Sequence, residues 1–135
     1  MFSSGNATIF VSDMDRSVHF YTKVLGLTLA QRFGNHWASV EVGKLAIGLH
    51  PASSQNPAGQ AGSTLVGLQL TGDIEDAIAT LKQQGVQFRG AVTQDNAGKT
   101  AYFADPDGNL LYMIQLTQWT REGSSERAYS GQTRS

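Results

Sequence analysis

One pattern of secondary structure occurs twice along this chain, and it limits the possible folds more than any other feature. A β-prone segment at residues 7–11 leads to Asp13, whose side chain can cap a helix. Apolar residues then recur at helical spacing until Gly26, which suits the position just past a helix end. Three strand-like segments follow, separated by turn-forming Gly and Asn residues, at 27–33, 37–42 and 44–49. We expect a β-α-β-β-β unit here.

The same order returns in the second half of the chain. A strand-like segment at 65–70 precedes Asp73, and a second apolar helical stripe ends at Gly85. The strand-like segments that follow are 86–88, 91–93, 99–103 and 110–116. Asp13 and Asp73 lie 60 positions apart, and Gly26 and Gly85 lie 59 apart. This spacing indicates a duplicated unit, and the alternative is an ordinary α+β domain whose two helices start alike.

Length and composition fit one domain and exclude several classes of function. The 135 residues predict a single domain over 1–117, with modules at about 6–50 and 65–117, a loop at 51–64 and a polar tail at 118–135. A formal charge of −1 gives no electrostatic case for binding nucleic acid or a membrane surface. The absence of cysteine excludes disulfides and thiolate chemistry. The first residues lack a signal-peptide pattern and no apolar run could span a bilayer, so we expect a cytoplasmic protein.

Two motifs carry a resemblance to a known family. Residues 11–21, Val-Ser-Asp-Met-Asp-Arg-Ser-Val-His-Phe-Tyr, continue into Val24-Leu-Gly-Leu27, and residues 105–109, Asp-Pro-Asp-Gly-Asn, precede the last strand. Together they resemble the opening and the closing hairpin of the vicinal oxygen chelate superfamily. That superfamily includes glyoxalase I, bleomycin-resistance proteins, fosfomycin-resistance transferases and extradiol dioxygenases. The resemblance implies an α+β fold in which two tandem βαβββ modules form a cupped mixed sheet that holds the substrate, often in a homodimer.

The resemblance also implies four positions that hold a divalent metal in the metal-dependent members. They lie on the first and last strands of both modules, and in this sequence they become Asn6, Gly48, Val66 and Tyr112, with Gly67 replacing Val66 if the strand slips by one residue. Glycine and valine side chains offer no donor atom, and asparagine or neutral tyrosine binds metal weakly. We therefore predict no metal and no cofactor. His50, two residues beyond Gly48, leaves a displaced metal site as the alternative.

A pocket without metal must hold its ligand through apolar contacts and a few polar groups. Strand alternation and nearby aromatic residues nominate eight ligand-binding residues: Asn6, Trp37, Gly48, His50, Val66, Leu68, Tyr102 and Tyr112. The aromatic residues among them have the alternative of serving only as core or sheet-face residues. Phe20 and Tyr21 are expected to pack against a sheet. Glu41 and His50 offer an acid–base pair only if they meet, and no other catalytic motif identifies catalytic residues.

Three functions remain open at this point. The prediction we favour is a metal-independent small-molecule-binding protein that sequesters an aromatic or cationic compound. We expect it to form a homodimer, and we favour binding over enzymatic activity. The second is a metal-dependent lyase, isomerase or dioxygenase centred on His50. The third is a dimeric accessory protein without a small ligand.

Overall fold

The computed structural model describes residues 1, 3–59 and 65–117. The predicted tail at 118–135 and residues 60–64 of the predicted loop lie outside the described residues. The first module contains β1 (Ala7–Val11), α1 (Met14–His19), the π-helical turn η1 (Phe20–Val24), β2 (Thr28–Phe33), β3 (Trp37–Val42) and β4 (Leu45–Pro51). The second contains β5 (Val66–Gln69), α2 (Ile74–Gln83), β6 (Gln87–Gln94), β7 (Gly98–Ala104) and β8 (Leu110–Leu116).

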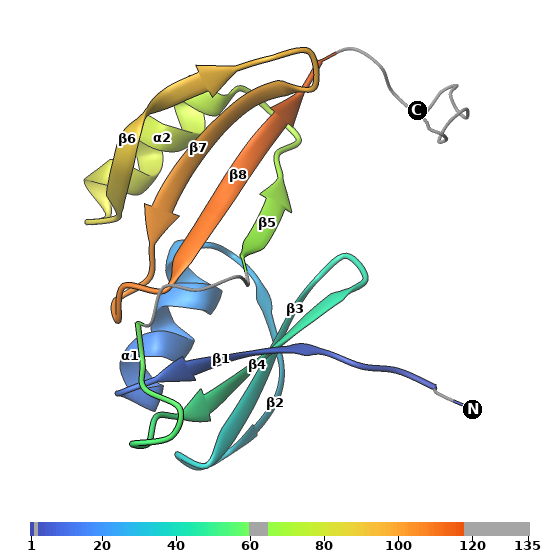
Figure 1. Cartoon of the computed structure of the whole chain (residues 1–135), viewed down its shortest axis with the longest axis vertical. Helices are drawn as coiled ribbons and strands as arrows, with labels where there is room; N and C mark the ends of the chain where they lie inside the picture. Colours follow the sequence, from blue (N-terminus) through green and yellow to red (C-terminus); the bar gives the residue numbers. More distant parts are fainter. Residues whose placement is uncertain (2, 60–64, 118–135) are drawn as a thin grey trace.

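Each module folds into its own four-stranded sheet. Sheet A has the strand order β1-β4-β3-β2, and sheet B has the matching order β5-β8-β7-β6. In both, the first strand pairs in parallel with the last, and the other pairs are antiparallel. The duplicated α+β pattern is therefore confirmed. The two sheets follow one another along the long axis of the molecule (Figure 1), and within the described residues no strand of one pairs with a strand of the other.

The segments predicted at 86–88 and 91–93 form one strand rather than two. β6 runs through both, and its register against β7 shifts between Arg89 and Thr93. Such an irregularity bends a strand without ending it. β4 is likewise longer than predicted, because it continues to Pro51, where the loop was expected to begin.

The helices cover one face of each sheet. α1 packs on β3 and β4, and α2 packs on β7 and β8. The buried residues alternate along the strands, as expected for sheets with one face in the core. They include Ala38, Val40, Ile47 and Leu49 in sheet A, and Val66, Ala101, Phe103, Leu111 and Met113 in sheet B.

The first helix begins as predicted but does not stay α-helical. The Asp13 side chain accepts from the backbone N–H of Arg16, which confirms the predicted cap. The chain then widens into η1, where the N–H of Leu25 bonds to the carbonyl of Phe20, before Gly26 ends the helix at φ 83°. The extra residue in this π-turn changes the direction of the side chains that follow α1.

A buried hydrogen-bond network around Asp105 joins the two modules. The Tyr21 hydroxyl, from the helix of the first module, donates to the Asp105 carboxylate at 2.8 Å, and both residues are buried. That carboxylate also accepts from the backbone N–H of Asp107 and from the backbone and side-chain N–H groups of Asn109. The Asn109 amide in turn donates to the carbonyl of Phe10 at the end of β1.

Asp107 makes the second half of this connection. Its carboxylate accepts from the backbone N–H and the hydroxyl of Ser12 and pairs with Arg16 at 3.2 Å. The turn between β7 and β8 is therefore more than the hairpin turn that its sequence predicts, because it docks against the end of β1 and the helix that follows. No helix among the described residues is long and apolar enough to cross a membrane.

We predict that Tyr21→Phe changes how stability depends on alkaline pH. Burial, and then the charge and hydrogen bond of Asp105, raises the pKa of Tyr21 well above its usual 10.0. The unfolded chain releases this proton near pH 10, so the stabilisation is complete below pH 10. It is lost as the pH rises toward the folded-state pKa, by about 1.4 kcal/mol per pH unit.

Denaturant unfolding at pH 8 and pH 11 checks this prediction. At pH 8 the variant should be less stable by about 1–3 kcal/mol, because Asp105 loses a buried donor. The difference should then shrink at pH 11, where the wild-type phenol favours the unfolded state. An equal difference at both pH values would contradict the assignment, and Tyr102→Phe provides the matched control.

Candidate functional site

The face of each sheet opposite its helix carries the candidate site, and we call it the open face. In sheet A the core residues Ala38 and Leu49 stand opposite one another, so their neighbours Trp37 and His50 project to the open face. In sheet B the core residues Val66 and Leu111 stand opposite one another, so Tyr112 projects to the open face. The two open faces belong to successive modules along the molecule (Figure 1).

A row of aromatic side chains crosses the open face of sheet A. Phe10 on β1 stands opposite His50 on β4, with ring centroids 5.7 Å apart and an edge-to-face geometry. Trp37 on β3 lies 6.5 Å from the same imidazole, and Phe33 stands opposite Trp37 on the edge strand β2. Phe33 is 62% exposed, so the row offers apolar ring surface to a ligand or to another molecule.

The Trp37 ring packs over a glycine on the neighbouring strand. A Cβ atom at Gly48 would stand 2.2 Å from the Trp37 ring, closer than any real contact. The missing side chain therefore makes room for the indole on the strand surface. Trp37, Gly48 and His50, all predicted as ligand-binding residues, are brought together in this way.

Sheet B carries a matching arrangement built on different strands. Tyr112 on β8 stands opposite Gly67 on β5 and Tyr102 on β7. A Cβ atom at Gly67 would stand 2.2 Å from the Tyr112 ring, and the two tyrosine ring centroids are 5.8 Å apart. Arg89 on the edge strand β6 stands opposite Tyr102 and completes the row.

The predicted positions of Val66 and Leu68 on the ligand side are wrong. Val66 is a core residue, and Leu68 packs against the core beneath α2. Gly67, which the sequence offered only as a slip of one residue, takes the open face instead. The cause is the spacing to the helix: five positions separate Thr8 from Asp13, but six separate Gly67 from Asp73. One extra residue in a strand exchanges its two faces.

The residues at the family's metal positions do not fit a divalent cation. On the open faces, the first and last strands place Thr8 opposite Gly48 and Gly67 opposite Tyr112. Asn6 lies just before β1, where its side-chain oxygen accepts from the Thr8 hydroxyl. These groups offer two glycines, a hydroxyl, an amide and a phenol, and no imidazole or carboxylate. Nowhere in the described part of the chain do three His, Asp or Glu residues gather closely enough to hold a metal.

His50 stands on the open face without a second metal-binding group. Its Nδ1 lies 2.9 Å from the carbonyl of Pro51, and its ring neighbours are Phe10 and Trp37. Glu41 shares this face and stands opposite Ala46. It lies four strand positions from Trp37, the neighbour of His50, and at about 3.3 Å per residue this separation is roughly 13 Å. The two groups therefore do not form the acid–base pair that the sequence left open.

Two aromatic open-face residues escaped the sequence analysis. Phe10 and Phe33 belong to the aromatic row of sheet A, and alternation from better-anchored neighbours would have located both. Glu41 and Arg89 are the charged residues of the two open faces within the described strands, one on each sheet. Their faces follow only from the pairing register, which the sequence does not show.

The comparisons with known proteins agree with this architecture. Residues 4–113 match the model of the Glyoxalase/Bleomycin resistance protein/Dioxygenase superfamily, and the chain belongs to this family. Because the match covers most of both modules, it confirms the family suggested by the two sequence motifs. None of the curated proteins compared with the sequence matches it.

Solved structures of the family resemble this chain across nearly their whole length. TnmS3, an antibiotic binding protein from Streptomyces sp. CB03234, is 26% identical, with 87% of this chain and 98% of that chain covered and a TM-score of 0.70. A family member from Sphaerobacter thermophilus DSM 20745 is 25% identical, with 85% and 98% covered and a TM-score of 0.67. Lactoylglutathione lyase from Agrobacterium tumefaciens, at 16% identity, 84% and 92% coverage and a TM-score of 0.67, shares the fold.

We predict that Gly48→Ala moves the Trp37 ring. The added methyl group needs the space that the indole occupies, and an aromatic side chain can swing away at modest cost. In a Trp119→Phe background, which leaves Trp37 as the single tryptophan, the fluorescence emission maximum should shift to longer wavelength. Unfolding stability should fall by about 1–2 kcal/mol or less. Gly67→Ala in the same background is the control, and an equal shift there would contradict the contact.

Proposed function

We propose that the protein binds a small planar compound, aromatic or cationic, on the open faces of its sheets and does so without a metal ion. The observation that carries this proposal is the pair of rings that occupy the space above glycines, Trp37 over Gly48 and Tyr112 over Gly67. Both rings lie on the open faces and are only partly buried, which favours stacking on flat groups and contact with cations. Two such rings, one in each module, could stack on opposite sides of one flat ligand.

The lack of donor groups at the positions that the family resemblance assigns to metal ligands supports binding rather than metal catalysis. Gly48 and Gly67 contribute no donor there, and Tyr112 is a ring platform. The proposal therefore assigns no catalytic residue. A cytoplasmic location stays a prediction.

The charges on the open faces bear on the choice of ligand. Glu41 is exposed on sheet A, on the same face as the aromatic row, so a cationic group on the ligand has an available partner. TnmS3 is an antibiotic binding protein that aligns with most of this chain, and this similarity also supports a small organic ligand.

We further propose that the pocket is completed by a second copy of the chain. Each open face is a sheet surface rather than an enclosed cavity, and a ligand pocket normally buries most of its ligand. The strands β1 and β5 are sheet edges whose outer backbone groups pair with no strand among the described residues. Pairing these edges between two copies would place sheet A of one beside sheet B of the other. A homodimer would then join Trp37 and Tyr112 in one site.

The ligand prediction is tested by a thermal-shift screen with planar aromatic compounds, half of them cationic. A compound present at 100 times its dissociation constant should stabilise the protein by about 2.7 kcal/mol. Trp37→Ala and Tyr112→Ala should each weaken binding by about tenfold, because each removes a stacking surface. Glu41→Gln should weaken only the cationic ligands.

Phe88→Leu, a change on the core side of sheet B, is the control for general loss of packing. The absence of any shift across the panel would contradict the ligand proposal. Metal analysis of protein purified without chelators tests the metal-free part. One equivalent of metal per chain, lost in His50→Ala, would contradict that part.

The shared pocket is tested by mixing two defective variants. Trp37→Ala and Tyr112→Ala each damage both pockets of a dimer, but a mixed dimer contains one pocket with neither substitution. Co-refolding the two should therefore restore wild-type affinity in a fraction of the sites, measured by calorimetry. If each chain forms its own pocket, or no dimer forms, the mixture will bind no better than its components.

A further inference from the structure

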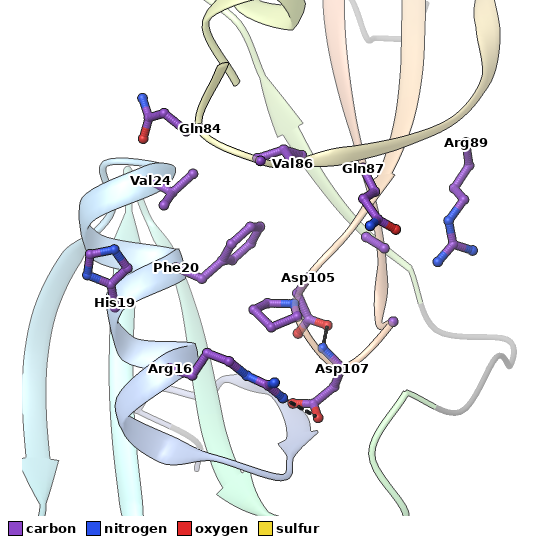
Figure 2. A pocket seen from close by; sticks show the side chains of 14 residues that line it. Arg16, His19, Phe20, Val24, Gln84, Val86, Gln87, Arg89, Asp105 and Asp107 are labelled. Atoms are coloured by element: carbon purple, nitrogen blue, oxygen red, sulfur yellow. Dashed lines mark hydrogen bonds and ion pairs between the residues drawn. The ribbon is translucent and has the colours of Figure 1, made fainter. Parts of the chain in front are cut away.

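A second cavity lies between the two modules and is separate from the aromatic rings of the open faces. This cleft has a volume of about 550 Å³, within the range of roughly 300–1,000 Å³ typical of small-molecule sites. One wall is the α1–η1 helix of the first module, and the other is formed by the start of β6 and the β7–β8 turn (Figure 2). None of the rings assigned to the proposed ligand site lines it.

Part of the cleft lining is apolar. Phe20, Val86 and Ala104 line it, and each is at least nine-tenths buried in the chain. In Figure 2 the Phe20 ring points from the helix toward Val86 across the space between the modules, with Val24 beside it. The π-helical turn η1 includes both Phe20 and Val24, so the local widening of the helix helps to shape this wall. Such a surface stabilises a bound apolar group by removing it from water.

The acidic residues of the cleft are already occupied. Asp105 accepts hydrogen bonds from Tyr21, Asp107 and Asn109. Asp107 accepts from Ser12 and pairs with Arg16. Neither carboxylate therefore needs a cation from a ligand.

Arg89 differs from these residues because it forms no ion pair or side-chain hydrogen bond within the described part of the chain. Figure 2 shows its guanidinium extending from β6 on the same side as the Gln87 amide, and both residues line the cleft. A guanidinium and an amide N–H beside an apolar wall form a combination that recognises an oxyanion attached to an apolar body. His19 provides a further N–H donor at the helix wall.

We propose that this inter-module cleft is a second binding site, specific for an amphipathic organic anion. The carboxylate or phosphate group binds to Arg89 and Gln87, and the apolar body lies along Phe20 and Val86. The site does not rest on the proposed open-face function. Because both modules line the cleft, a bound ligand also favours one relative position of the two sheets.

NMR titration of the ¹⁵N-labelled full chain tests the site, with octanoate and octyl phosphate as anionic probes. Both should give saturable shifts of backbone amides in residues 19–24 and 84–89. 1-Octanol and octylamine should bind at least about tenfold more weakly, because they lack the anionic group. If octanoate binds and octyl phosphate does not, the site is a carboxylate site, and the reverse result assigns it to phosphate monoesters.

Variants separate the head-group contact from the apolar wall. Arg89→Glu should weaken octanoate by about tenfold or more, and Arg89→Lys should retain part of the affinity, since the positive charge remains. Val24→Asn, which adds no charge, should weaken it through the apolar wall at a half-buried position that the fold tolerates better than Phe20. Lys44→Glu makes the same charge change as Arg89→Glu at an exposed turn outside the cleft, and should leave binding unchanged.

Three results would overturn the proposal. They are equal binding of octanol and octanoate, undiminished binding by Arg89→Glu, and shifts confined to amides around Gly48 and Gly67. The last pattern would place the probe on the open faces instead. Failure of the aromatic screen on those faces leaves the cleft titration unaffected, so the two proposals fail separately.

Discussion

The buried carboxylate of Asp105 is the group on which the arrangement of the two modules depends. A carboxylate removed from water needs several hydrogen bonds, and Asp105 obtains them from its own turn and from the Tyr21 hydroxyl of the other module. Losing this partner while Asp105 stays buried would leave part of this demand unmet, so the Tyr21 hydrogen bond stabilises the two modules in contact. The Asp107 contacts to Ser12 and Arg16 add a second, more exposed link.

This junction has a direct consequence for function. It docks the β7–β8 turn against the helix and first strand of the other module, so that the sheets follow one another along the molecule (Figure 1). The open faces then stay available to a ligand or to a second chain, while the cleft forms between the α1–η1 helix, the start of β6 and the β7–β8 turn. One set of hydrogen bonds thus shapes both candidate sites.

The residues of the open faces suit a stacking site better than a metal site. Two of the positions that the family resemblance assigns to metal ligands hold Gly48 and Gly67, and each glycine makes room for an aromatic ring. A position without a side chain offers no donor atom and lets a neighbouring ring lie on the strand. The same two residues therefore support both the metal-free part and the stacking part of the proposed function.

Local patterns in the sequence determined much of the fold. The Asp13 and Asp73 caps, the glycines that end both helices and the alternating strands were all readable, because each depends on contacts between residues close in the chain. The grouping of Trp37, Gly48 and His50 was also predicted. Val66 was placed on the wrong face because one extra residue before Asp73 reverses the strand alternation. The repeat of the two modules in the sequence did not reveal that extra residue.

What the sequence by itself determined is therefore the duplicated module with its helix caps. Only the tertiary structure decided which face each strand presents, that Tyr21 donates to Asp105, and that Arg89 reaches a cleft between the modules. The physical reason is range. Caps and strand periods arise from neighbouring residues, whereas register and burial arise from contacts between residues as many as 99 positions apart.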